Sequence, residues 1–272
     1  MLIAGDSDEV SAFRVRNRTF VDSLDVLEDT CNAVFVRDLP SVSPADAVIF
    51  YLGLRCVDDF REILLLCANG HGQGASALLR GLYERAVTCA HLHVNPEQAA
   101  DFVDFDFVQR RKLMTALGML DEDSDSTDGA VAELEADYQR VRDRFMVTDC
   151  SKCGTKRPSV SWSKMDFVSM AKKAGLIGKL VIPAYYMPLS HAHSTLRSIT
   201  AKLQEDNGVL SLEDELDYRE TDWTLRIAHL VLLQTINSQL EHFAFTDCDS
   251  AVADANAAFS RSWPVQPPRF VG

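Results

Sequence analysis

The stretch from Gly70 to Asn95, GHGQGASALLRGLYERAVTCAHLHVN, constrains the fold more than any other part of the chain. A glycine-rich turn begins it and Asn95-Pro96 ends it, and both features are typical of the two ends of a helix. At about 100° per residue, one broad face of this helix collects the apolar residues: Ala75, Leu78, Leu79, Leu82, Ala86, Cys89 and Ala90. A helix with so wide an apolar face must pack against other helices, so the stretch predicts a helical bundle.

The same helical periodicity recurs along the chain. Ser7 or Asp8 is expected to cap a first helix, and Ser43 with Pro44 to begin a second. We expect helices over about 7–36, 44–69, 75–94, 96–118, 130–147, 163–174, 188–203 and 222–245, and a short one after 249. No alternating strand pattern is present. The sequence therefore predicts an all-α class, with a single bundle of about seven to nine helices, mostly antiparallel neighbours, in one domain over residues 1–272.

Two segments are expected to lie outside this bundle. Residues 121–129, DEDSDSTDG, predict a mobile acidic loop because they contain no apolar residue. Residues 264–272 predict an irregular tail because three prolines interrupt them.

Charge and cysteine usage indicate the compartment. The formal net charge of −13 disfavours binding to the phosphate backbone of a nucleic acid. Such binding would need a local basic patch such as Arg110-Arg111-Lys112. The 7 cysteines lie mostly in apolar helical stretches, where Cys56, Cys67 and Cys89 are expected to be buried thiols. There is no signal-peptide pattern and no apolar run long enough for a membrane span. We therefore expect a cytoplasmic protein with no membrane contact.

Arg80, Glu84 and His91 form a narrow polar stripe opposite the apolar face of the 75–94 helix. Arg80 and Glu84 are four residues apart and can form an ion pair. If the stripe faces solvent, the pair contributes little. If it faces the bundle interior, it is a candidate site. His93 lies on the apolar face and is expected to be a core or interface histidine.

A second polar group follows Pro188. Ser190, His193 and Arg197 would share one face of a helix that begins there, with Tyr186 just before it. Serine and histidine suggest a nucleophile and its base, but a triad needs a third group and no nucleophile-elbow motif is present. A hydrogen-bonded polar seam is the simpler interpretation.

Metal and cofactor motifs are weak. Cys150-x-x-Cys153 supplies one pair of ligands where structural zinc needs four, and whether this pair binds metal stays open. Phosphate-loop and dinucleotide fingerprints are absent. We therefore predict no cofactor and no metal.

Three features follow one another along the chain: the run GASALLRGLYERAVTCAHLHVNPEQAADFVDF, a tryptophan before a short helix, and the motif Y-x-x-L-S-x-x-H. In these motifs the chain resembles a prokaryotic family of helical proteins known as domain of unknown function 5677, over about Ala47 to Arg197. The resemblance implies that the family's recurrent polar positions fall on Arg80, Glu84, Tyr186, Ser190 and His193. It also implies that the stripe faces the seam, and it assigns no activity.

The chain is also weakly similar to the helical toxin and defence ribonucleases of the HEPN type, whose motif is arginine, four to six residues, then histidine. Arg85-AVTCA-His91 fits this spacing. Ala86 stands where that family usually has a polar residue, and Arg85 lies well round the helix from His91, so the two would not obviously converge.

Three hypotheses follow. The first is a bundle, expected to be a homo-oligomer, whose polar pocket binds a small anionic ligand or a protein partner through Arg80 and Glu84 facing Tyr186, Ser190 and His193. The second is a metal-independent ribonuclease, with His193 or His91 as acid or base and Arg80 or Arg85 stabilising phosphate charge. The third is a purely structural module whose polar groups fix helix register.

Overall fold

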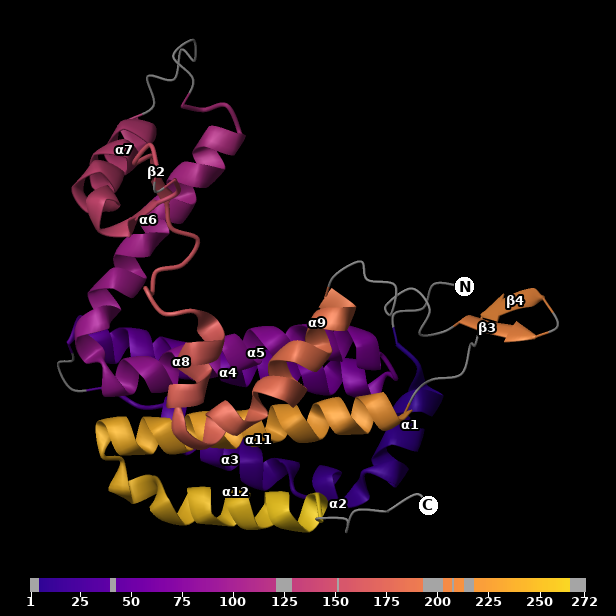
Figure 1. Ribbon diagram of the computed structural model, residues 1–272. Coiled ribbons are helices and arrows are strands. Elements are labelled where there is room, and N and C mark those ends of the chain that lie inside the picture. The colour runs from indigo at the N-terminus through magenta and orange to yellow at the C-terminus, as the bar shows by residue number, and fades with distance from the viewer. Residues whose placement is uncertain are drawn as a thin grey trace. The chain divides into compact units, whose positions relative to one another are not determined.

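The computed structural model describes residues 5–39, 43–120, 129–150, 152–192, 203–206, 208–212 and 218–264. The all-α class is confirmed, because helices make up most of the regular structure of these residues, and the strands among them form only two short hairpins (Figure 1). The chain divides into two compact units, residues 1–94 with 170–272 and residues 95–169, and each is described by itself. The single domain expected over residues 1–272 stays a prediction.

The first unit holds most of the helices. Its α-helices are α1 (Ser7–Arg16), α2 (Arg18–Val21), α3 (Leu24–Phe35), α4 (Pro44–Ala68), α5 (Gly72–Val94), α9 (Met187–Ala192), α11 (Tyr218–Phe243) and α12 (Asp249–Ser262). Its shorter turns are η3 (Gly175–Leu180), η4 (Ile182–Tyr186) and η5 (Thr246–Cys248). Strands β3 (Leu203–Asp206) and β4 (Val209–Leu212) form an antiparallel hairpin.

The second unit contains η1 (Pro96–Gln98), α6 (Ala99–Ala116), α7 (Gly129–Val141), η2 (Arg142–Phe145), β1 (Met146–Thr148) and β2 (Lys156–Pro158). Helix α8 (Phe167–Lys173) spans the boundary between the units. A small aromatic core holds α6, α7 and η2 together, and it is built from Phe105, Val108, Tyr138, Val141 and Phe145 with Phe107 and Trp162 against it.

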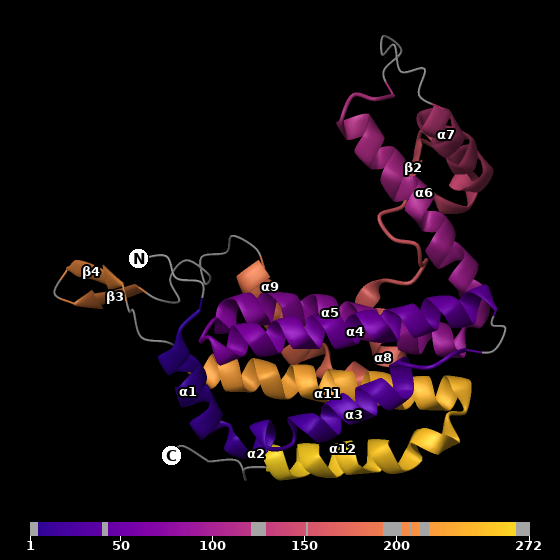
Figure 2. The same ribbon diagram turned by 180° about the vertical axis from the view of Figure 1, so that it is seen from behind.

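Three long helices, α4, α5 and α11, pack against one another and form the core of the first unit (Figures 1 and 2). Their facing side chains are almost fully buried: Ile49, Ile63, Leu79, Leu82, Leu225, Leu232 and Ile236. Each such side chain contributes about 1.5–3 kcal/mol by leaving water. Helix α12 packs on α3 and α11. Arg80 and Glu84 lie on α5, one of these three helices.

Helix α4 begins as the sequence predicts. The Ser43 hydroxyl accepts the Asp46 N–H at 3.2 Å, and the Asp46 carboxylate accepts the Ser43 N–H at 2.8 Å, so a capping box precedes Pro44. The expected cap of the first helix was wrong. Asp6, not Ser7 or Asp8, has the extended backbone of a cap, and its carboxylate accepts the N–H groups of the second and third residues after it.

The described ranges contain eleven α-helices, more than the seven to nine expected. The predicted helix over 7–36 is divided into α1, α2 and α3, because Asn17 and Ser23 leave the helical conformation. Asn17 donates its side-chain N–H to Asp222 at 3.0 Å, and the Ser23 hydroxyl donates to the Phe20 carbonyl at 2.8 Å. Such local bonds compete with helix continuation.

No strands were predicted from the sequence, and this was wrong at two places. Hairpins β1–β2 and β3–β4 have only three and four residue pairs each. Strands this short carry too little alternation to be recognised in a sequence. The acidic loop predicted over 121–129 and the tail predicted over 264–272 lie outside the described residues, except for Gly129, which begins α7, and Pro264. No helix in the described ranges is long and apolar enough to cross a membrane.

Gly53 is expected to tolerate no side chain. It lies in α4 where α11 approaches, and a Cβ there would come within 2.6 Å of Gln239 Nε2 and 2.8 Å of Phe35 Cε1. Overpacking of this kind costs about 1–3 kcal/mol. We predict that Gly53→Ala lowers the free energy of unfolding in urea by about 2 kcal/mol. Gly74→Ala is the matched control, because the nearest atom to its Cβ is 3.6 Å away. Equal stability of the two variants would contradict the close packing.

Candidate functional site

The guanidinium of Arg80 is held between two helical elements. Its Nε donates to Glu84 Oε1 at 2.8 Å, and its Nη2 donates to the Tyr185 hydroxyl at 3.3 Å. The same group lies over the Tyr185 ring, 4.7 Å from the ring centre. The side chains of Arg80 and Glu84 are 24% and 42% exposed. Arg80 is therefore fixed in orientation and still reached by solvent.

The backbone explains why these groups meet. Arg80 and Glu84 are one turn apart on α5, and both α9 and η4 pack on that helix. η4 is a π-helical turn, closed by the Met187 N–H donating to the Ile182 carbonyl five residues back. In a regular α-helix the ring of Pro188 would clash with the Ala184 carbonyl, and we attribute the wider turn to this proline. Single π turns of this kind recur at functional sites.

The resemblance implies Tyr186 as the tyrosine that faces Arg80, and the structure places the neighbouring Tyr185 against it. Tyr185 contacts Arg80, whereas Tyr186 is 48% exposed and packs edge-on against Tyr185 at 5.4 Å between ring centres. The π turn adds a residue to the helical period, so a regular helix extended back from Pro188 misplaces the preceding tyrosines. The side chain of Ser190 and all of His193 lie outside the described residues, so their part of the seam stays a prediction.

Two residues of the ribonuclease hypothesis, Arg85 and His91, are engaged within the fold. Arg85 donates from Nε and Nη2 to the two carboxylate oxygens of Asp59, both at 2.7 Å, and Asp59 is buried. The hydrogen bond with Asp59 raises the pKa of Arg85. His91 is buried as well, on the same helix. Arg85 and His91 are therefore engaged within the fold, and the hypothesis then depends on its other two residues, Arg80 and His193, of which His193 lies outside the described residues.

The basic residues Arg110, Arg111 and Lys112 contact other residues of the second unit. Arg111 pairs with Glu135 at 2.8 Å, and the Lys112 ammonium donates to the Ser159 carbonyl at 2.6 Å. Arg110 lies 3.9 Å from Asp106. These contacts leave the cluster poorly suited to bind a phosphate backbone.

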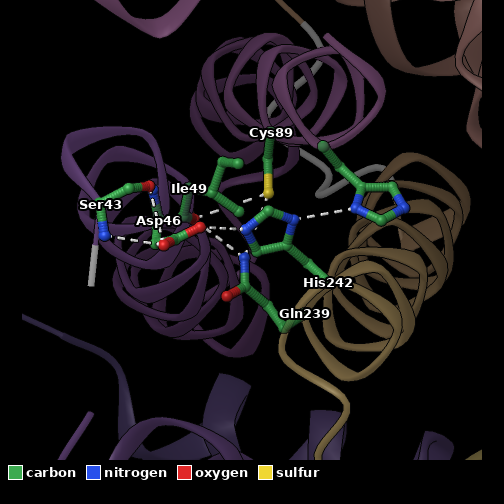
Figure 3. A network of polar contacts seen from close by, with 7 residues as sticks. Ser43, Asp46, Ile49, Cys89, Gln239 and His242 are labelled. Carbon is green, nitrogen blue, oxygen red and sulfur yellow. Dashed lines mark hydrogen bonds and ion pairs between the residues drawn. The ribbon is translucent and has the colours of Figure 1, made fainter. Parts of the chain in front are cut away.

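A polar chain that the sequence interpretation missed links α4, α5 and α11 (Figure 3). His242 Nε2 lies 2.8 Å from Asp46 Oδ1, and His242 Nδ1 lies 3.0 Å from His93 Nδ1. Burial raises the pKa of Asp46, but hydrogen bonds from Ser43 and His242 outweigh it, so the pKa lies below its usual value. One of the facing Nδ1 atoms must donate and the other accept, and this contact joins α5 to α11 as the His242–Asp46 contact joins α11 to α4.

Beside this chain, Gln239 reaches from α11 into the core (Figure 3). Its Nε2 donates to the Ile49 carbonyl at 2.9 Å and lies 3.1 Å from the Cys89 sulfur. The expected burial of Cys56, Cys67 and Cys89 is confirmed. Burial raises the pKa of Cys67 and of Cys89 to about 12 and that of Cys56 well above its usual value, so these thiols are inert.

Comparison with known proteins identifies the family. The model of a family of unknown function, DUF5677, matches residues 46–210, which is more than half of the 272-residue chain. The chain belongs to this family. The DUF5677 match includes Arg80, Glu84 and Tyr185 and ends before α11, so it contains the Arg80 site in full but not His242. No curated protein and no solved structure matches the chain significantly.

Proposed function

We propose that this DUF5677 protein binds a small anionic ligand at Arg80. The observation that carries the proposal is the Arg80 guanidinium, which is stacked on Tyr185, held by Glu84 and still partly exposed. A pre-oriented guanidinium binds a carboxylate or phosphate with little loss of side-chain entropy. The Tyr185 hydroxyl adds a second group that can hydrogen-bond the ligand.

The surroundings indicate what else the ligand contains. Ile182, Tyr186 and Met187 are exposed on the same π turn and the start of α9. Exposed apolar side chains on the turn that carries Tyr185, the partner of Arg80, favour a ligand with an apolar or ring-shaped part as well as its negative charge. We therefore infer a phosphate or carboxylate that carries such a part, with Tyr186 offering its ring.

The other two hypotheses remain open and have less support. A HEPN-like ribonuclease needs an accessible arginine and histidine; Arg85 is paired with Asp59 and His91 is buried, which leaves Arg80 and His193, and His193 lies outside the described residues. A purely structural role agrees with the Arg80–Glu84 pair but leaves the exposed π turn without a purpose. The seven cysteines are all free thiols, which supports the proposed cytoplasmic location.

Thermal melting with a panel of anions tests the proposal. The panel contains inorganic phosphate, citrate, aromatic carboxylates and nucleoside mono- and diphosphates. A ligand at 100 times its Kd stabilises the folded state by about 2.7 kcal/mol, which raises Tm by roughly 5–10 °C. We expect Arg80→Gln to weaken binding roughly 10- to 100-fold, because a charge-assisted hydrogen bond contributes about 1.5–3 kcal/mol.

Arg55→Gln is the matched control. Arg55 also lies on a helix of the first unit and pairs with an acid three residues away, Asp58, at 2.8 Å. This variant is expected to bind the ligand as the wild type does, whereas Tyr185→Phe is expected to bind more weakly. If every anion shifts the Tm of the wild type, Arg55→Gln and Arg80→Gln equally, Arg80 is not a ligand site. If Arg80→Gln only melts early without any ligand effect, the structural role is correct.

A further inference from the structure

The β1–β2 hairpin of the second unit presents two cysteines on one tight turn. The Asp149 N–H donates to the Thr155 carbonyl at 2.8 Å, and the Gly154 N–H donates to the Cys150 carbonyl at 2.9 Å. Gly154 has a φ of +71°, which glycine adopts readily. These bonds close the turn so that Cys150 and Cys153, three residues apart, flank its tip. The spacing and the hairpin are those of a zinc knuckle.

The two thiols of this turn differ from the buried cysteines of the bundle. Both are free, Cys150 is half-buried and Cys153 is exposed. The Cys153 sulfur lies 2.9 Å from the Thr155 hydroxyl oxygen. Zinc binds cysteine as the thiolate, and the free thiols of Cys150 and Cys153 supply two such ligands at the spacing that zinc sites use.

One chain supplies only half of a tetrahedral site. In the described ranges, no group of three or more His, Cys, Asp or Glu side chains is arranged to hold a metal ion. A structural zinc site of this type takes four ligands. A two-fold axis through the metal would bring the same two thiolates from another copy of the chain and close the tetrahedron.

The local charge fits this arrangement. Four thiolates around a divalent cation leave a charge of −2. Lys152 and Lys156 are exposed on the same hairpin, in a chain whose formal net charge is −13. The lysines of two copies would repel one another without an anionic group between them, and the metal–thiolate centre supplies that group.

We propose that Cys150 and Cys153 bind a Zn²⁺ ion together with Cys150 and Cys153 of a second copy of the chain. The ion joins two chains through their hairpins. The site lies in the second unit, away in the sequence from Arg80, so it stands or fails independently of the proposed anion binding.

Zinc content and mass test the proposal together. The full chain is reduced, incubated with ZnCl₂, desalted, and measured by elemental analysis and light scattering. We expect one zinc per two chains and a mass near 60 kDa, twice the 30.2 kDa of one chain. A strong chelator is expected to remove the zinc and halve the mass. Co²⁺ in place of Zn²⁺ should give the visible absorption of a tetrahedral all-thiolate site.

Variants then assign the ligands. Cys150→Ser and Cys153→Ser should each lose the retained zinc and the dimer, with helical circular dichroism unchanged. Val160→Ser, an exposed change just beyond β2, should keep both. One zinc per monomer would overturn the proposal, because ligands of the same chain would then complete the site. A protein that retains no zinc would also overturn the proposal, and so would one that instead forms a Cys150–Cys153 disulfide. A wild-type cobalt spectrum without thiolate bands would overturn it as well.

Discussion

Replacing Arg85 by glutamine is expected to lower the free energy of unfolding by about 3 kcal/mol. Arg85 gives Asp59 two hydrogen bonds of 2.7 Å, and Asp59 is buried between α4 and α5. Removing one partner of such a pair leaves a buried charge without compensation, which costs about 3–5 kcal/mol. We expect the lower end of this range, because the Arg85 side chain is 36% exposed and Arg55 lies 3.9 Å from Asp59.

Urea unfolding measures this effect. Arg61→Gln is the matched control, because Arg61 is an exposed arginine on α4 that lies 3.9 Å from Asp58, and it should change stability by less than about 0.5 kcal/mol. Adding Asp59→Asn to Arg85→Gln should restore part of the loss, since the buried charge is then gone. A stable Arg85→Gln protein would show that Arg85 is not needed for the fold, and the ribonuclease hypothesis would regain support.

Acid is expected to unfold the protein partly through one histidine. His229 is buried, with the rings of Phe20, Phe60 and Phe259 within 5.0–5.8 Å of its own. Its Nδ1 accepts the Trp263 indole N–H at 3.1 Å, and its Nε2 has no hydrogen-bond partner among the described residues. Burial lowers the pKa of His229 from 6.5 to about 3, so the folded protein keeps this imidazole neutral.

The unfolded chain therefore takes up this proton first as the pH falls. The stability that His229 contributes is complete above pH 6.5 and is lost as the pH falls from 6.5 to about 3. A shift of this size corresponds to a loss on the order of 5 kcal/mol at the acid limit.

The pH dependence of urea unfolding in wild type and His229→Phe measures this loss. The ring of phenylalanine fits the aromatic cluster and binds no proton, so the variant should lose less stability as the pH falls from 6.5 to about 3. The slope of its free energy of unfolding against pH should be smaller than that of the wild type by up to the value for one proton. Carboxylates titrate in both proteins and cancel in the comparison. Identical slopes would show that His229 is protonated in the folded state.

The helices were predictable because local signals mark their ends. Ser43-Pro44 begins α4, and Asn95-Pro96 ends α5, close to where the sequence places them. The apolar face of the 75–94 helix likewise predicted burial of Ala75, Leu79 and Leu82. These features depend on residues a few positions apart, and a sequence displays them directly.

The polar contacts were harder to predict because they depend on packing between distant segments. Asp46 and His242 are 196 residues apart, and no periodicity relates them. No sequence motif singles out His242, yet it joins α11 to both α4 and α5. The partner of Arg80 was missed by one residue, because a π turn cannot be seen in apolar spacing.

The most direct test of the Arg80 site is isothermal titration calorimetry with the anion that raises Tm most. We predict one ligand per chain for the wild type and for Arg55→Gln, and an affinity roughly 10- to 100-fold lower for Arg80→Gln, as expected for loss of one charge-assisted hydrogen bond. Equal affinities for wild type and Arg80→Gln would contradict the account, because the ligand would then bind somewhere other than the guanidinium on Tyr185.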